Sequence, residues 1–274
     1  MLIPIPTAKK QLFHFLVLIV AGVFQSLHTG AQILNVDRNI PADSSKRFFA
    51  LLALSGSADK QKKDLVDIST SADITYQLPR SLVIVFKANT DLTTNGNDLI
   101  QNSGFLHLRY RDNDTRKLYP EIFTQLQWNG VLGMDERILA GANLRFMAVH
   151  KDDNDMFAGI GLMGEWETWN YKGVRGLDNP ELLPLVVVKK IRINQYLKWA
   201  WKISDKTDFV IANFIQLPLD NLEKPRIASS AAVNFRLLKW LGLAINYDSM
   251  YDLDPVVPIS KYYYSLRSTL NLVF

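Results

Sequence analysis

The last fourteen residues of the chain alternate between apolar and polar positions with a period of two. Successive side chains of an extended strand point to opposite faces, so this pattern gives a strand with two different sides. One side carries Tyr262, Tyr264, Leu266, Ser268, Leu270, Leu272 and Phe274. The other carries Tyr263, Ser265, Arg267, Thr269, Asn271 and Val273. The segment therefore predicts a strand that meets hydrocarbon on one face and water on the other.

The same alternation recurs along the chain and predicts twelve strands, separated by turn residues and without a helical period. The expected spans are 46–56, 64–77, 81–92, 102–111, 118–129, 138–150, 155–171, 185–203, 207–218, 225–238, 240–251 and 261–274. Many reach the roughly 9–11 residues that a tilted membrane strand needs, and an even count suits a closed barrel. The predicted fold is all-β: a closed antiparallel transmembrane β-barrel of about twelve strands.

The connections between these spans alternate in length, which gives the barrel a direction. Brief turns follow the even strands, at 78–80, 112–115, 151–154, 204–206 and 238–239. Longer segments follow most odd strands, at 56–63, 93–101, 172–184 and 252–260. Short periplasmic turns and longer extracellular loops are typical of outer-membrane barrels, with both chain ends in the periplasm.

The N-terminal segment predicts export. Lys9 and Lys10 precede an apolar run over 12–24, and the small residues of 29–31 follow it. This order is that of a secretory signal peptide, and the run is shorter than the roughly 20 apolar residues of a spanning helix. We expect a signal peptide over 1–31, an N-terminal periplasmic segment over 32–45 and the barrel over 46–274.

Composition excludes several other classes of protein. The chain is 48% hydrophobic and 21% charged and has no second long apolar stretch, so spanning helices after residue 31 are excluded. Its net charge is only +4, and two of those charges lie in the predicted signal peptide, so nothing points to nucleic acid. The absence of cysteine excludes disulfides and thiolate metal sites. We expect neither a cofactor nor a bound metal.

Charged residues within the strands indicate which face is the interior. A lysine or arginine that faces lipid at the bilayer midplane costs about 2–4 kcal/mol, so the charged side must face inward. Alternation then predicts these lumen-lining candidates: Asp67, Asp73, His107, Arg109, Asn143, Arg145, Glu165, Glu167, Lys190, Arg192, Lys198, Arg236 and Arg267. Two readings stay open, a narrow polar path for small solutes and a closed interior filled by salt bridges. Gly159 and Gly161 allow another group to approach, and we expect Arg145 there, with Glu165 or Glu167 meeting its charge.

Aromatic residues gather near both ends of the predicted strands, as in the two interfacial girdles of membrane barrels. Those near the periplasmic ends are Tyr76, Tyr110, Tyr119, Trp199, Trp201, Trp240 and Phe274. Those near the outer ends are Trp128, Trp166, Trp169, Tyr171, Tyr247, Tyr251 and Tyr262.

A family resemblance rests on three neighbouring segments. Residues 119–129 read Tyr-Pro-Glu-Ile-Phe-Thr-Gln-Leu-Gln-Trp-Asn, residues 137–146 read Arg-Ile-Leu-Ala-Gly-Ala-Asn-Leu-Arg-Phe, and residues 157–167 read Phe-Ala-Gly-Ile-Gly-Leu-Met-Gly-Glu-Trp-Glu. This order resembles the salt-induced outer-membrane protein family, which comprises predicted barrels of unknown function. The chain differs at Ala140 and Ala142, where that family often has glycine. The resemblance implies a closed barrel and supplies no substrate.

These observations predict the compartment and the partners. A C-terminal aromatic residue that closes such a strand looks like the assembly signal of outer-membrane barrels, here carried by Tyr264, Leu266, Leu270, Leu272 and Phe274. We expect a monomer in the outer membrane of a Gram-negative bacterium. Its expected partners are membrane lipid, lipopolysaccharide, the barrel assembly machinery and small solutes or ions.

An enzyme is the main alternative, since some outer-membrane barrels hydrolyse lipids with serine and histidine. After residue 31 the chain has two histidines, His107 and His150, and neither lies in a recognisable nucleophile motif. We therefore expect no enzymatic activity, with a lipid hydrolase as the minor alternative. Asp252 and Asp254 would offer oxygen ligands for divalent cations that bridge lipopolysaccharide.

Overall fold

The computed structural model describes residues 47–60, 62–79, 82–112, 118–238 and 240–272, and these form one antiparallel sheet of twelve strands. The strands are β1 (Phe48–Lys60), β2 (Asp64–Gln77), β3 (Leu82–Asn95), β4 (Asp98–Asp112), β5 (Leu118–Asn129), β6 (Met134–Lys151), β7 (Asn154–Trp169), β8 (Val186–Ser204), β9 (Thr207–Pro218), β10 (Arg226–Arg236), β11 (Leu241–Asp252) and β12 (Tyr262–Leu272). Each strand pairs with its sequence neighbours. The prediction of an all-β, twelve-stranded antiparallel fold is confirmed. The predicted signal peptide and the segment over 32–45 lie outside the described residues.

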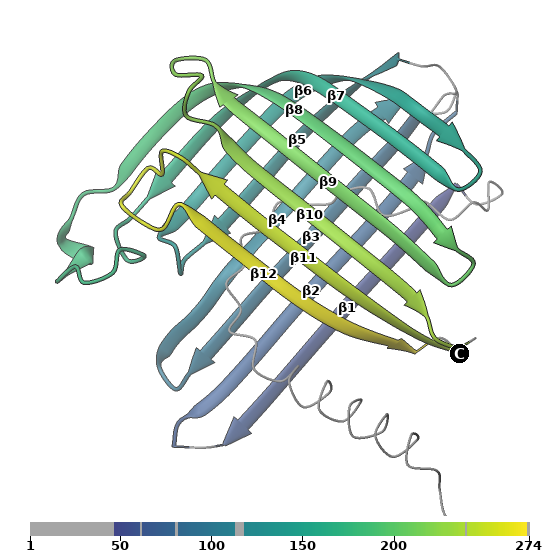
Figure 1. Ribbon diagram of the computed structural model, residues 1–274. Coiled ribbons are helices and arrows are strands. Elements are labelled where there is room, and N and C mark those ends of the chain that lie inside the picture. The colour runs from purple at the N-terminus through teal and green to yellow at the C-terminus, as the bar shows by residue number, and fades with distance from the viewer. Residues whose placement is uncertain (1–46, 61, 80–81, 113–117, 239, 273–274) are drawn as a thin grey trace, which may run out of the picture.

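The sheet curls round on itself, so that β9–β12 lie in front of β1–β4 (Figure 1). In the strand order β1 and β12 are the two ends, and no pairing joins them within the described residues. All thirteen residues of β1 are exposed. Closure of the barrel between β12 and β1 stays a prediction.

The outer face of the sheet is apolar and the inner face is charged, as the alternation of residues along the strands predicts. On β8, Ile191, Leu197 and Trp201 are exposed, whereas Arg192 and Lys198 are buried. The same division holds on β7, where Leu162 is exposed and Glu165 is buried. A sheet with apolar residues outside and charged residues inside inverts the usual arrangement of a water-soluble protein.

Short and long connections alternate less regularly than predicted. The structure continues the strands through parts of 56–63 and 93–101, leaving connections at only 61–63 and 96–97, so the predicted long loops there are wrong. Small and polar residues pair in register, for example Ser57 with Asp67, so the ladder continues without apolar side chains. Gly96, with φ 63°, makes the tight turn from β3 to β4.

Three connections after odd strands are long, at 170–185, 219–225 and 253–261. We call the end of the sheet that bears them the loop end, and the opposite end the turn end. The first of these connections contains a 3-10 helix, Pro180–Leu182. Within the described ranges, no helix is both long and apolar enough to cross a membrane.

Half of the fourteen aromatic residues predicted for the girdles are exposed. Tyr76, Tyr110, Trp166, Trp201, Trp240, Tyr251 and Tyr262 are exposed. Tyr119 and Trp169 are buried, so their placement in a girdle is wrong. Both have the inward parity of their strands. Trp169 packs with Leu132, Met134 and Val257 in a cluster at the loop end, which we call the apolar cap.

Candidate functional site

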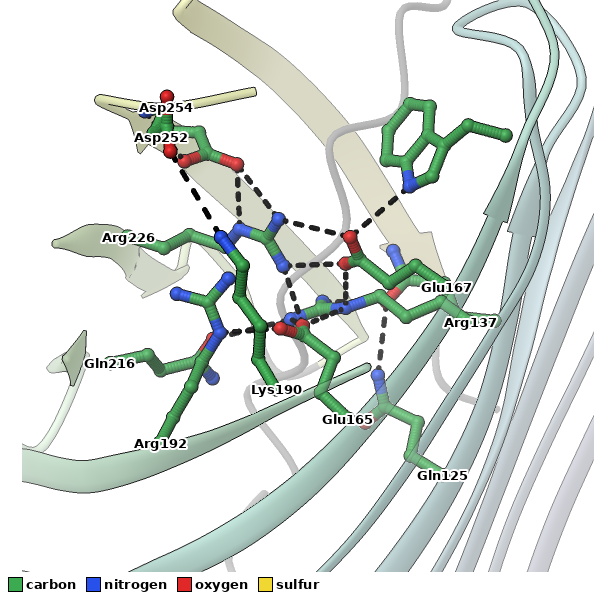
Figure 2. A network of polar contacts seen from close by, with 12 residues as sticks. Gln125, Arg137, Glu165, Glu167, Lys190, Arg192, Gln216, Arg226, Asp252 and Asp254 are labelled. Atoms are coloured by element: carbon green, nitrogen blue, oxygen red, sulfur yellow. Dashed lines mark hydrogen bonds and ion pairs between the residues drawn. The ribbon is translucent and has the colours of Figure 1, made fainter. Parts of the chain in front are cut away.

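A network of three guanidinium groups and three carboxylates fills part of the interior near the loop end (Figure 2). We call it the six-residue network; its members are Arg137, Glu165, Glu167, Arg192, Arg226 and Asp252. All six are buried. The network comes from β6, β7, β8, β10 and β11, so it joins five strands of the sheet.

Glu165 and Arg226 lie at its centre. Glu165 accepts hydrogen bonds from Arg137, Arg192 and Arg226. Nη1 of Arg226 lies 2.7 Å from Oε1 of Glu165 and 2.8 Å from Oε1 of Glu167. Its Nε lies 2.8 Å from Oδ2 of Asp252. Each of these two residues therefore bridges three oppositely charged partners.

Strand parity and register explain how the sequence builds this arrangement. Inward positions are odd-numbered on β6 and β7 and even-numbered on β8, β10 and β11, as their burial shows. Arg137 stands in register with Glu167, and Arg226 with Asp252. Side chains directly opposite on antiparallel strands are close, so these two pairs form locally. Curvature of the sheet then brings Arg226 to β7.

The charges of the network balance, which is the condition for burying them. Desolvation of an ion costs several kcal/mol, and only close opposite charges and hydrogen bonds offset that cost. Neutral partners add further bonds: Trp169 donates to Glu167 at 3.1 Å, and Arg137 donates to the amide oxygens of Gln127 and Gln216 at 3.3 and 3.2 Å. The six-residue network is thus electrically neutral and hydrogen-bonded. Trp169 connects it to the apolar cap.

The carboxylates at the loop end are engaged by cationic side chains of the chain itself. Asp252 belongs to the six-residue network. Asp254 lies 3.1 Å from the Nζ of Lys224 and 4.0 Å from that of Lys190. These internal pairs engage the oxygens that Asp252 and Asp254 would offer to a divalent cation.

A second charged cluster lies nearer the turn end, around Glu121 of β5. Glu121 accepts from Nδ2 of Asn143 at 2.8 Å, and Arg109 and Arg145 approach it at 3.7 and 4.0 Å. The guanidinium of Arg145 lies 4.1 Å from the centre of the Phe157 ring, a cation–π distance. Arg145 therefore contacts Glu121, and its predicted pairing with Glu165 or Glu167 is wrong.

Gly159 and Gly161 admit close neighbours; Arg145 stands in register with Gly159, although the atoms nearest to an added Cβ belong to other residues. A Cβ at Gly159 would overlap the ring of Tyr196 from β8. A Cβ at Gly161 would overlap Asn143 and the backbone of Ala142 on β6. The missing side chains let β6, β7 and β8 pack their inner faces tightly.

Between the two charged clusters the interior is nearly full. A cavity of about 50 Å³ remains, lined in part by His107, Gln125, Asn143, Asn194, Tyr196 and Gln216. A buried water needs about 10–15 Å³ by a comparable measure, so this space suits a few waters. The part of the interior bounded by β4–β10, which we call the filled half, contains the second cluster, this cavity and every member of the six-residue network except Asp252 of β11.

The side next to β2 and β12 is different, and we call it the open half. Asp67 and Asp73 of β2 and Arg267 of β12 face inward and are only partly buried. Two ion pairs occur there, Lys87 with Asp73 at 2.7 Å and Arg267 with Asp248 at 3.1 Å. These three inward residues are therefore more accessible to solvent than the buried members of the two clusters, although Thr75 of β2 and Lys87 of β3 are buried.

The structure places the remaining predicted residues as follows. Lys190 is half-buried near Asp254, and Lys198 is buried on β8. Arg236 is exposed at the turn end, where it donates to the backbone oxygen of Asp205 at 3.2 Å, so it does not line an enclosed interior. Tyr264, Leu266 and Leu270 are exposed on the outward face, while the side chains of Leu272 and Phe274 lie outside the described residues.

The two histidines lie in unrelated settings. His107 is buried on β4, with Nδ1 3.0 Å from Oε1 of Gln125 and its ring stacked on Phe123. His150 is exposed at the turn end, and its Nδ1 lies 2.7 Å from Asp155. These contacts are with an amide and a carboxylate, whereas a histidine-activated nucleophile has a hydroxyl or thiol beside the base.

Four members of the two clusters are absent from the lumen-lining candidates: Arg137, Glu121, Arg226 and Asp252. Arg226 shares the parity of Asn234 and Arg236 within a predicted strand, and this signal is enough to place it inside. Asp252 lies one residue beyond the predicted strand end, so only the structure assigns it to a strand.

The fold and this interior define a class: twelve-stranded antiparallel β-sheet proteins with an apolar outer face and a charged, ion-paired inner face. The chain belongs to the family described as "Protein of unknown function, DUF481", whose profile matches residues 53–274. No curated protein matches the chain.

Among solved structures, the chain is similar to one described as "NanC porin structure in rhombohedral crystal form". The TM-score is 0.44 and the sequence identity 10%, over 83% of this chain and 99% of that chain. At this level of similarity none of that protein's properties is carried over.

Proposed function

We propose that the protein is an outer-membrane β-barrel of a Gram-negative bacterium that passes small polar solutes through the open half of its interior. The outward face supports the membrane location, because exposed Leu162, Ile191 and Leu197 cover it between strand ends that carry aromatic residues. In this proposal β1 pairs with β12 and encloses the open half. The filled half then forms a rigid wall beside the path.

The observation that carries the proposal is the uneven burial of inward side chains around the sheet. On β10 and β8, Ser230 and Asn194 are buried. On β2 and β12, the inward Ser71 is exposed and Ser265 is half-buried. Polar inward side chains that water reaches are what a narrow polar path requires.

Cysteine scanning tests the path directly, because the chain has no cysteine of its own. Ser71→Cys and Ser265→Cys place a thiol in the open half, and Ser230→Cys is the matched control in the filled half. Each variant is inserted in a planar bilayer and treated with a water-soluble methanethiosulfonate reagent while the current is recorded. We expect current through the unmodified protein, and a reduction in current on modification at residues 71 and 265 but not at 230.

Two outcomes would contradict the proposal. Absence of current at any salt concentration or polarity would exclude a path. Modification that lowers the current only at residue 230 would place the path in the filled half.

A second candidate function is supported by a different observation. The neutral six-residue network and the small cavity favour a structural envelope barrel whose interior is closed. A protein of this kind would insert in the bilayer and give no current, although its thiols at 71 and 265 would still react in detergent. The same set of variants therefore separates the two candidates.

The remaining functional expectations are separate proposals. Lipid hydrolysis is the minor alternative, and mixed-micelle assays of the protein and of its His107→Ala and His150→Ala variants would test it. Recognition of Tyr264, Leu266, Leu270, Leu272 and Phe274 by the assembly machinery predicts poor insertion when the last residues are deleted.

A further inference from the structure

Five basic residues of the interior are held in ion pairs, which lowers the positive charge expected along a solute path. Arg137, Arg192 and Arg226 belong to the six-residue network and are buried. In the open half, Lys87 pairs with Asp73 and Arg267 with Asp248. A charge that is neutralised by a neighbour contributes little field to a path beside it.

Two carboxylates of the open half have a different environment. Thr93 donates from Oγ1 to Oδ1 of Asp67 at 2.6 Å, and Ser57 Oγ lies 3.5 Å from its Oδ2. Ser69 donates from Oγ to Oδ1 of Asp91 at 2.7 Å. Within the described residues, neither carboxylate has a cationic partner.

Geometry keeps these two carboxylates close to each other and close to water. Ser69 stands in register with Asp91, and Asp67 with Thr93, so the two acids lie on adjacent strands two positions apart. Both face inward and both are only partly buried. Lys63, in the neighbouring β1–β2 connection, pairs with Asp98.

We infer that the path through the open half prefers small cations, and that Asp67 and Asp91 set this preference. This inference rests on the proposed function. Two negative charges without cationic partners beside a narrow polar path raise the local concentration of cations and lower that of anions. Hydroxyl donors hold both carboxylates in place without neutralising them.

Reversal potentials test the preference. The protein is inserted in a bilayer of neutral phosphatidylcholine with unequal KCl concentrations on the two sides. We expect a reversal potential of the sign that shows K⁺ to be more permeant than Cl⁻. The Asp67→Asn/Asp91→Asn variant should move it toward zero. Asp64→Asn, which removes an exposed carboxylate of outward parity on the same strand as Asp67, is the control and should leave the reversal potential unchanged.

The outcomes separate this inference from the proposed function. No current overturns both. Current with a zero or anion-selective reversal potential, or a double variant identical to the wild type, overturns the cation preference and leaves the path intact.

A second readout does not depend on conductance. Thiol modification of Ser71→Cys by a cationic and by an anionic methanethiosulfonate is compared with modification of free cysteine. We expect a relative excess for the cationic reagent that is lost when Asp67 and Asp91 are replaced by asparagine. An unchanged ratio would overturn the assignment to these two residues.

Discussion

The guanidinium of Arg226 lies 2.8 Å from the carboxylate of Glu167, although 59 residues separate them in sequence and β8 and β9 separate their strands. This contact spans the concave side of the sheet, where ladder hydrogen bonds do not reach. The ion pair thus links β7 to β10 across the curved sheet, in addition to the backbone hydrogen bonds between neighbouring strands.

Replacing Arg226 by methionine should strongly destabilise the protein. The change removes the guanidinium that pairs with the buried carboxylates of Glu167 and Asp252. Removing one partner of a buried ion pair costs about 3–5 kcal/mol, because the other charge stays buried without compensation. Urea unfolding in phospholipid vesicles measures the loss. Lys224→Met, which removes a half-exposed partner of Asp254, is the control and should change stability by about 0.5 kcal/mol or less. Equal losses for both variants would contradict the role of Arg226.

The pair of Arg226 and Asp252 should be energetically coupled. Arg226→Met and Asp252→Asn each leave an uncompensated charge, whereas the double variant removes one charge of each sign. We expect the double variant to be more stable than the sum of the single effects predicts, by about 0.5–3 kcal/mol. Unfolding of the four proteins of the cycle measures the coupling, and strict additivity would show that the pair does not act as a unit.

Gly159→Ala should destabilise the sheet through a steric conflict. The new Cβ would overlap the ring of Tyr196, and overpacking of this kind costs about 1–3 kcal/mol. Gly56→Ala is the matched control, because its Cβ would meet only the backbone oxygen of Asp67 at 3.6 Å. Thermal unfolding compares the two variants, and a stable Gly159→Ala protein would show that Tyr196 moves aside freely.

Asp205, in the turn between β8 and β9, should titrate at low pH. A hydrogen bond from Lys202, whose Nζ lies 2.9 Å away, lowers the pKa of this carboxyl below its ordinary value. A lowered pKa contributes stability above the pKa of the unfolded chain, and this contribution disappears as the pH falls through the folded pKa. Carbon NMR titration of the carboxyl measures the shift. Lys202→Met should raise the pKa of Asp205, and Lys172→Met, in the β7–β8 connection, should not.

Pairing of β1 with β12 should be visible by amide exchange. The ladder with β2 protects only alternate amides of β1, and the others point to the open edge. Closure would protect both sets. Hydrogen exchange followed by NMR in lipid nanodiscs measures this, and fast exchange at every second residue between Phe48 and Lys60 would contradict a closed barrel.

Face assignment is the part of the structure that the sequence predicts best. On β8 the period of two places Arg192 and Lys198 inside and Ile191 outside, and the structure has the same arrangement. The rule succeeds because successive side chains of a strand point to opposite faces, so alternating charged and apolar residues are separated by the sheet.

Strand length is harder to predict where the side chains are small and polar. Residues 56–63 and 93–101 resemble loops in composition, yet the ladder continues through most of both. Backbone hydrogen bonds hold these parts, and such bonds leave little trace in the side chains. For the same reason the sequence did not predict that Asp252, the final residue of β11, belongs to the strand.

Partner choice inside the sheet could not be predicted, because it depends on strand offset and curvature. Arg145 shares a face with Glu165, but β6 and β7 pair so that Arg145 stands opposite Gly159. Glu165 is instead reached by Arg226, from a strand three places away. Periodicity gives the face of a residue, and only three-dimensional structure gives its neighbour across the interior.

The order of charges along the chain has a consequence for folding. Every strand pairs with its sequence neighbour, so the sheet is able to grow one hairpin at a time. The hairpins from β6 to β8 bring Arg137, Glu165, Glu167 and Arg192, two charges of each sign. The later hairpin of β10 and β11 brings Arg226 together with Asp252, again one of each sign. The network charge is therefore balanced once β8 has joined and balanced again once β11 has joined.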